Sequence, residues 1–210
     1  LRLTGCDAAV QEIRNRMPFR YGKAVLTRAP LLHVRVSIES KDGKTASGLA
    51  ADCLPPLWFD KDPSKSFRQN VEDQIAAFRK AREVYLQAAE KPQAACEIWQ
   101  AAHSRLLDEG ARTGLNALTA SFGGSFIERA MIDALSRLRG VSFFEALRED
   151  LLGIETSKIL PAEPPSSIKI RHTVGLSDPI TKGEIPPSER LEDGLPQALE
   201  EDIEFYGITY

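Results

Sequence analysis

The sequence lacks a long hydrophobic run and an excess of positive charge. No apolar stretch of the 210-residue chain approaches the roughly 20 residues that span a bilayer, so no membrane role is expected. The formal net charge of -3 offers none of the basic surface that nucleic-acid binding requires. With 42% hydrophobic and 27% charged residues, the composition is that of an ordinary globular protein.

Cysteine is also scarce. Cys6, Cys53 and Cys96 are odd in number and widely spaced, and no two of them form a C-x-x-C pair. Such cysteines are typical of reduced thiols that act as small hydrophobic residues in a cytoplasmic protein. Residues Leu1–Thr4 include neither a methionine nor a charged-then-apolar signal pattern, so we expect the translational start to precede Leu1 and the localisation to be cytoplasmic.

Residues 1–53 show the alternation of apolar and polar residues that is typical of strands. Leu31–Glu39 and Thr45–Cys53 flank a turn at Asp42-Gly43, which predicts a hairpin, and Thr4–Ile13 predicts a third strand. We therefore expect a three-stranded antiparallel sheet with one face covered by helices. The residues expected on the covered face of the second strand are Leu32, Val34, Val36 and Ile38.

From Ser66 to Leu152 the apolar period becomes that of helices. Two apolar stripes separated by Pro92 predict a pair of helices, the second of which ends at Gly110. The sequence therefore predicts an α+β domain over residues 1–154, in which a bundle of about four helices packs on the sheet.

The remaining two helices of this bundle are indicated by matching start signals. Ser125–Glu128 and Ser142–Glu145 both have the S-x-x-E pattern of a capping box, and Gly140 between them is typical of a helix end. Gly123-Gly124, just before the first box, is expected to serve close packing and capping.

A linker and a second domain are expected after residue 154. Residues 155–167 contain three prolines and no hydrophobic period. Ile168–Leu176 predicts a strand, Ser177–Gly194 a long loop, and Leu195–Tyr206 a helix with Pro196 in its first turn, after which Ile208 begins another strand. This order predicts a parallel βαβ unit. A closed (β/α)8 barrel needs roughly 250 residues, so residues 168–210 would be the first βα unit and the start of the second strand of an incomplete barrel.

The whole order resembles the enolase superfamily, in its mandelate racemase and muconate lactonizing enzyme branch. Arg16–Gly22 (RMPFRYG) is similar to the mobile loop after the branch's first strand, and Val34–Phe59 is similar to its second and third strands. The most specific likeness is Phe122–Ile154. The residues that stand at the expected places there are Ala130, Asp133, Gly140 and the closing Leu151-Leu152-Gly153.

The resemblance implies an intact enzyme that removes the proton α to the carboxylate of a small-molecule substrate. Mg²⁺ would stabilise the enediolate, and the product would define an isomerase, a racemase or a lyase. In the family the base lysines lie on the second barrel strand and the metal ligands on the next three, so we expect this chain alone to lack both, to bind no metal and to be inactive. It would supply the cap and the substrate-specificity loops. The alternative is a non-catalytic binding or scaffold protein that retains the capping fold.

Two segments and one strand hold candidate substrate-binding residues. Residues 13–38 contain no acid, so their basic residues would either attract an anionic substrate or form a solvated edge of the sheet; the resemblance points to Arg20 and Tyr21. Trp58 and Phe59 would either bury in the bundle or line a substrate pocket. His172 lies in the first expected barrel strand and would be either structural or near the site. The basic residues of the acid-free segment 13–38 are Arg14, Arg16, Arg20, Lys23, Arg28 and Arg35.

The acids of the sequence do not converge on a metal site. Asp133 is expected to be a structural acid at the edge of the bundle. The acids of residues 177–194 share no strand end or helical spacing and are expected to be solvated loop charges. An exposed pair of barrel strands would also favour a homo-oligomer. The acids of residues 177–194 are Asp178, Glu184, Glu189, Glu192 and Asp193.

Overall fold

The computed structural model describes residues 1–210 except 23, 162, 170, 172–174, 176 and 208–210. The chain forms two compact units. Unit 1 consists of Leu1–Ile13 and Ala29–Pro164, and unit 2 consists of Arg14–Arg28 and Pro165–Tyr210.

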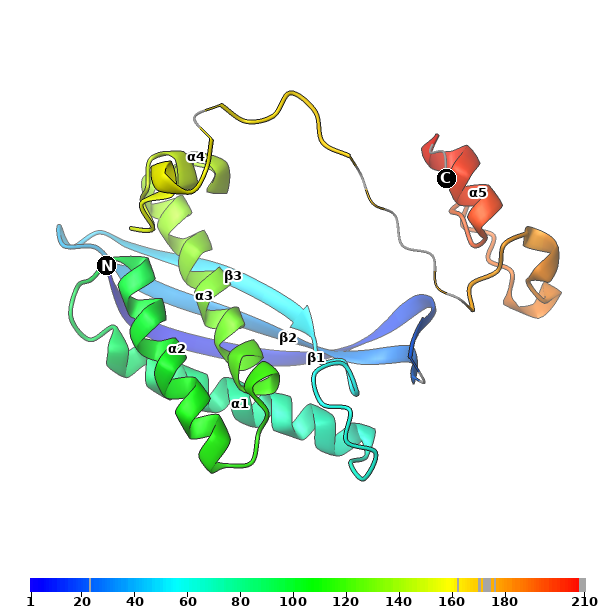
Figure 1. The fold of residues 1–210 in the computed structure, drawn as a ribbon, viewed down its shortest axis with the longest axis horizontal. Helices are drawn as coiled ribbons and strands as arrows, with labels where there is room; N and C mark the ends of the chain where they lie inside the picture. Colours follow the sequence, from blue (N-terminus) through cyan, green and yellow to red (C-terminus); the bar gives the residue numbers. More distant parts are fainter. Residues whose placement is uncertain (23, 162, 170, 172–174, 176, 208–210) are drawn as a thin grey trace. The chain divides into compact units, whose positions relative to one another are not determined.

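A three-stranded antiparallel sheet with the order β1-β2-β3 forms one layer of unit 1 (Figure 1). Its strands are β1 (Arg2–Tyr21), β2 (Ala24–Glu39) and β3 (Thr45–Cys53), and the distal parts of β1 and β2 belong to unit 2. The predicted hairpin between β2 and β3 is confirmed. Gly43 has a φ of 80°, and its N–H donates a hydrogen bond to the carbonyl of Ser40 at 3.0 Å.

The second layer of unit 1 is helical. The helices are α1 (Phe67–Ala88), α2 (Ala95–Arg112), α3 (Ala117–Arg139) and the short α4 (Phe143–Arg148). A capping box at Ser66 begins α1, with Gln69 as its third residue. The coarse prediction of an α+β fold with a three-stranded sheet and about four helices packed on it is therefore confirmed for this unit.

The start of α3 differs from the prediction. Asn116 caps this helix by accepting a hydrogen bond from the N–H of Thr119 at 2.9 Å. Ser125 lies inside the helix, where its hydroxyl donates to the carbonyl of Phe122 at 2.8 Å. The prediction of a helix start at Ser125 is wrong because S-x-x-E spacing also occurs between neighbours on one face of a continuous helix.

The other helix boundaries are closer to expectation. Ser142 forms the predicted capping box with Glu145, and Gly140 ends α3 in the left-handed conformation, with a φ of 68°. The α2 helix ends at Arg112 rather than at Gly110. Gly110 is instead a contact residue, because a Cβ there would lie 2.6 Å from the Cβ of Ala120.

Helix α3 lies directly on strand β3. A Cβ at Gly48 would come within 2.1 Å of the carbonyl oxygen of Ala130 and 2.2 Å of the nitrogen of Ala134, so only glycine permits this approach. The N–H of Leu49 donates to Asp133 Oδ2 at 2.8 Å. This bond satisfies a backbone group of an edge strand, and Asp133 has the structural role that was expected of it.

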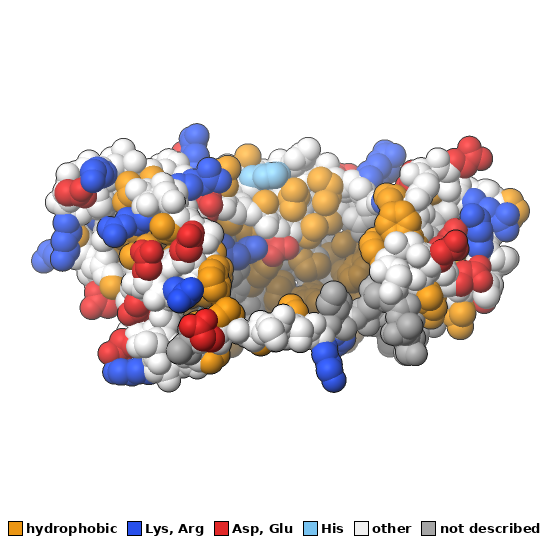
Figure 2. All heavy atoms as spheres, turned by 90° about the horizontal axis from the view of Figure 1, so that it is seen from above, with side chains coloured by type: hydrophobic (Ala, Val, Ile, Leu, Met, Phe, Trp, Pro, Cys, Tyr) orange, Lys and Arg blue, Asp and Glu red, His pale blue; other side chains and the backbone are white. Residues whose placement is uncertain are grey.

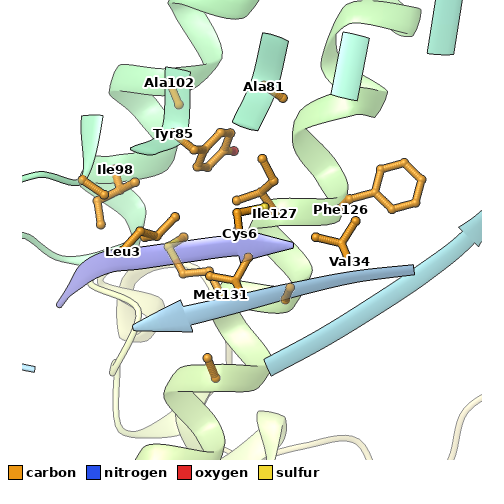
Figure 3. Packing of buried hydrophobic residues seen from close by; sticks show 14 of the residues in the cluster. Leu3, Cys6, Val34, Ala81, Tyr85, Ile98, Ala102, Phe126, Ile127 and Met131 are labelled. Carbon is orange, nitrogen blue, oxygen red and sulfur yellow. The ribbon is translucent and has the colours of Figure 1, made fainter. Parts of the chain in front are cut away.

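One hydrophobic core joins the two layers. The predicted face of β2 is confirmed, since each of its four apolar residues is at most 2% exposed. Figure 3 shows how side chains of the sheet point toward the helices. The labelled contacts come from Leu3 and Cys6 of β1, Val34 of β2, Tyr85 of α1, Ile98 of α2 and Phe126, Ile127 and Met131 of α3.

The C-terminal part of unit 2 has one helix, α5 (Leu199–Tyr206), and the 3-10 turns η2 (Lys182–Glu184) and η3 (Pro187–Glu189). The helix begins four residues later than predicted, because the Glu201 carboxylate accepts from the N–H of Gln197 at 3.0 Å and of Ala198 at 3.2 Å and so caps it there. Pro196 therefore precedes the helix instead of lying in its first turn.

The first expected barrel strand is described only in part. In the predicted strand 168–176 the described residues are Ile168, Lys169, Arg171 and Gly175, and none of them is in a strand. The rest of this segment, and the strand expected from Ile208, lie outside the described residues. Among the helices of the described part, none is long and apolar enough to cross a membrane. On the face seen in Figure 2, charged side chains of both signs are spread out, with hydrophobic side chains exposed between them.

Candidate functional site

The candidate residues Arg20 and Tyr21 lie on a two-stranded ribbon. Residues Arg14–Arg28, which we call the ribbon tip, are the distal ends of β1 and β2, and Gly22 between them has a φ of 53°. The Asn15 side chain donates to the carbonyl of Leu26 at 2.7 Å and ties the two strands together. The mobile loop expected at Arg16–Gly22 is therefore mostly strand.

The residue types between Arg16 and Gly22 are compatible with a strand at the edge of a sheet. β1 is an edge strand, where Pro18 can lack an N–H without breaking the sheet. Phe19 and Tyr21 are aromatic residues that favour strands, and their ring centroids are 5.3 Å apart. Partial burial raises the pKa of Tyr21, whereas Phe19 is 52% exposed.

The ribbon tip concentrates positive charge. It contains five basic residues and no acid. Arg14 is exposed and Arg20 is half-buried. A guanidinium in such a position can bind the carboxylate or phosphate of a ligand through two parallel hydrogen bonds.

Arg16 already has a carboxylate partner within unit 2. Its Nε lies 2.5 Å from Asp193 Oδ2, and its terminal nitrogens donate to Asp193 Oδ1 at 2.8 Å, to the Leu195 carbonyl at 2.8 Å and to the Pro196 carbonyl at 2.9 Å. The hydrogen bonds from Arg16 hold the pKa of the Asp193 carboxyl at about 2. Asp193 is therefore an exposed loop acid, as expected, and it also forms an ion pair with Arg16 that the sequence did not indicate.

Other acids of this loop serve its local structure. The Asp178 carboxylate accepts from the N–H of Gly175 at 2.7 Å, and the Glu184 carboxylate accepts from the N–H of Ile180 at 3.1 Å. No group of three His, Cys, Asp or Glu side chains that could hold a metal ion occurs among the residues that the structure describes. The acids of residues 177–194 thus do not fit a Mg²⁺ site.

The Trp58-Phe59 pair lies in unit 1, where its two rings have different environments. Phe59 stacks on Phe122 of α3 with centroids 4.3 Å apart, and its carbonyl accepts from the Asn116 side chain at 3.3 Å. Trp58 is 48% exposed. Phe59 is thus half-buried and packs on the bundle, while the indole of Trp58 keeps an accessible surface.

The loop that carries these aromatics is held by the residue before them. Leu57 has a φ of 60°, and its N–H donates to the Asn70 side chain at 3.0 Å. Asn70 is 2% exposed, so the strained residue is fixed by a buried partner on α1. His172, the fifth candidate, lies outside the described residues.

A partly buried acid was missed by the sequence analysis. Glu128 of α3 lies near Trp99 and His103 of α2, whose rings stack with centroids 4.9 Å apart. Burial raises the pKa of Glu128, while nearby His103 and Arg129 and a hydrogen bond from Trp99 oppose the shift. Glu128 was interpreted only as the last residue of a capping box. The four-residue spacing of Trp99 and His103, which places both rings on one face of a helix, was the sequence signal for its surroundings.

An open groove of about 470 Å³ lies along α3 and the start of α4. Its charged side chains are already paired: Arg137 with Asp133 at 2.8 Å, and Arg129 with Asp52 of β3 at 3.2 Å. These pairs fasten α3 internally and to the sheet, so the groove is better explained by packing than by ligand binding.

The structure thus groups the candidates by segment. Arg20 and Tyr21 lie together on the ribbon tip of unit 2, and Trp58 and Phe59 lie together on a loop of unit 1. In comparisons with known proteins, no family model matches the chain and no curated protein matches it.

Proposed function

We propose that this chain is the capping and substrate-specificity part of an enzyme of the enolase superfamily, in its mandelate racemase and muconate lactonizing enzyme branch. The observation that carries the proposal is the position of Ala130, Asp133 and Gly140, the residues on which the resemblance depends most. Ala130 contributes the backbone that contacts Gly48, Asp133 binds an edge N–H of β3, and Gly140 ends α3 in the left-handed conformation.

Each of these positions needs its residue type for a physical reason. A side chain larger than Ala130 would compete with the close approach of α3 to β3, a carboxylate accepts the N–H of Leu49 strongly, and glycine adopts a positive φ without strain. A likeness at three sites where packing, a hydrogen bond or a positive φ restricts the choice of residue is better support than a likeness at unrestricted positions.

The ribbon tip suggests how such a cap would take part in recognition. A carboxylate substrate would be attracted by the acid-free segment, in which Arg20 is half-buried beside Tyr21. The exposed indole of Trp58 is the second candidate contact, while the ring of its neighbour Phe59 stacks on Phe122.

In the proposed enzyme, Mg²⁺ would stabilise the enediolate. As the resemblance implies, the proposal assigns the Mg²⁺ ligands and the base lysines to the later strands of the barrel. The contribution of this chain would be to bind, orient and enclose the carboxylate.

The proposal is tested by exchange of the proton α to a carboxylate. The product of the entire gene is incubated with Mg²⁺ and a panel of 2-substituted carboxylic acids in deuterium oxide, and incorporation at the α carbon is followed by NMR. We expect incorporation by the gene product and none by the 210-residue chain alone. Incorporation by the chain alone would contradict the proposal.

Variants then test the assigned residues. Arg20→Ala and Trp58→Ala should raise KM for the active acid, whereas Arg68→Ala at the exposed start of α1 serves as a matched control. The gene sequence distinguishes the enzyme from the alternative, a binding or scaffold protein. A Lys-x-Lys motif soon after Tyr210, followed by acids at the ends of later strands, supports the enzyme. A stop codon at that point supports a binding or scaffold protein instead.

A further inference from the structure

All three nitrogens of the Arg16 guanidinium donate hydrogen bonds. Three nitrogens of one side chain make four hydrogen bonds, two to the Asp193 carboxylate and two to consecutive carbonyls, those of Leu195 and Pro196. A planar fork of donors suits such a set, and a lysine in its place would reproduce only the charge.

The acceptor side of this contact is an ordered turn. Gly194 has a φ of 73°, and Asp193 Oδ1 also accepts from the N–H of Leu195 at 3.1 Å. The Gln197 side chain braces the turn by accepting from the N–H of Leu191 at 2.6 Å and donating to the carbonyl of Glu189 at 3.1 Å. The acceptors are therefore held in place before Arg16 engages them.

Charge favours the same pairing over a longer range. The ribbon tip has five bases and no acid, whereas residues 165–210 have nine acids and four bases. Glu201 of α5 adds to the negative surroundings of the Arg16 guanidinium. The two parts of unit 2 are thus complementary in charge.

We propose that Arg16 is a clasp that holds the ribbon tip on the turn Asp193–Pro196, and that the tip is released when an anion or salt takes the place of the Asp193 carboxylate. Arg16 and Asp193 retain 31% and 39% of their side-chain exposure, so ions in solution can reach the pair. The device goes beyond the proposed function and does not depend on it, because it concerns the order of a segment and not a reaction.

The clasp is tested by hydrogen exchange on the 210-residue chain. Arg16→Gln and Asp193→Asn should each raise the exchange rate of residues 14–21 and 191–199 roughly three- to fivefold, without changing exchange in α1–α3. Arg14→Gln is the matched control, since it removes an exposed arginine from the same strand. It should leave both segments as in the parent protein.

Two further experiments distinguish a specific Arg16–Asp193 clasp from a general effect of charge on hydrogen exchange. The exchanged pair Arg16→Asp with Asp193→Arg should recover part of the lost protection. In the parent protein, 1 M NaCl should raise exchange in both segments, and in Arg16→Gln it should add little. Equal exchange in Arg16→Gln and the parent, or an equal rise in Arg14→Gln, would overturn the proposal.

Discussion

Replacing Gly48 with alanine should separate helix α3 from strand β3. The new Cβ would meet the Ala130 carbonyl oxygen at 2.1 Å, the Ala134 nitrogen at 2.2 Å and the Ala134 Cα at 2.8 Å. Comfortable contacts between such atoms lie at about 3.5 Å, so the helix would have to move by roughly 1 Å. All three obstructing atoms belong to the backbone, and no side-chain rotation relieves the clash.

The cost can be estimated from three contributions. Overpacking a core costs about 1–3 kcal/mol, and a clash with backbone belongs at the upper end of that range. Displacement of α3 also weakens the hydrogen bond from Leu49 N–H to Asp133, which is worth about 1 kcal/mol. Alanine also lowers the conformational entropy of the unfolded chain, which stabilises the folded state by about 0.4–1 kcal/mol and offsets part of the loss. The expected net loss is about 3 kcal/mol in the free energy of unfolding.

The assay is thermal unfolding followed by far-UV circular dichroism, which reports mainly the helices of unit 1. For a protein of this size, a loss of about 3 kcal/mol should lower Tm by roughly 6–12 °C. Gly5→Ala is the control, because its Cβ would meet only the Ser37 Cβ at 3.9 Å, an ordinary contact on the same sheet. If Gly48→Ala is as stable as Gly5→Ala, α3 does not approach β3 as described.

Two further predictions concern α3 and its charged face. Asn116→Ala should cost about 1 kcal/mol in urea unfolding because it removes the helix cap, whereas Ser125→Ala should change stability by less than about 0.5 kcal/mol; the reverse ranking would restore the capping-box start at Ser125. Burial raises the pKa of Glu128 above its ordinary value of 4.5, so the native state binds this proton more tightly than the unfolded chain and loses stability as the pH rises through the shifted pKa. Glu128→Gln should therefore be more stable than the parent at pH 7, and unfolding at pH 4 should show this gain to be smaller; an equal gain at both pH values would point to packing instead.

Local patterns predicted much of unit 1. The alternation in β2, the Asp42-Gly43 hairpin, the Ser142 box and the end of α3 at Gly140 each depend on residues within a few positions of one another. The same reasoning failed at Ser125, because a capping spacing and a helix face have the same period and only the residues upstream distinguish them.

The functional candidates were harder to predict for the same reason. Composition drew attention to the acid-free segment around Arg16, and the aromatic pair Trp58-Phe59 stood out in its loop. Whether Phe59 packs or binds depends on Phe122, which is distant in sequence. The ion pair of Asp193 was not predicted because its partner Arg16 is 177 positions away.

By itself, the sequence determined most of the segments of unit 1 that become strands and helices, and the face that β2 buries, since period and capping are properties of short stretches of chain. The tertiary structure decided that α3 rests on Gly48, that Asp133 binds the edge of β3, and that Arg16 engages the turn after Asp193. Those contacts join residues from remote parts of the chain. Their existence depends on how the folded elements meet in space, which no local pattern encodes.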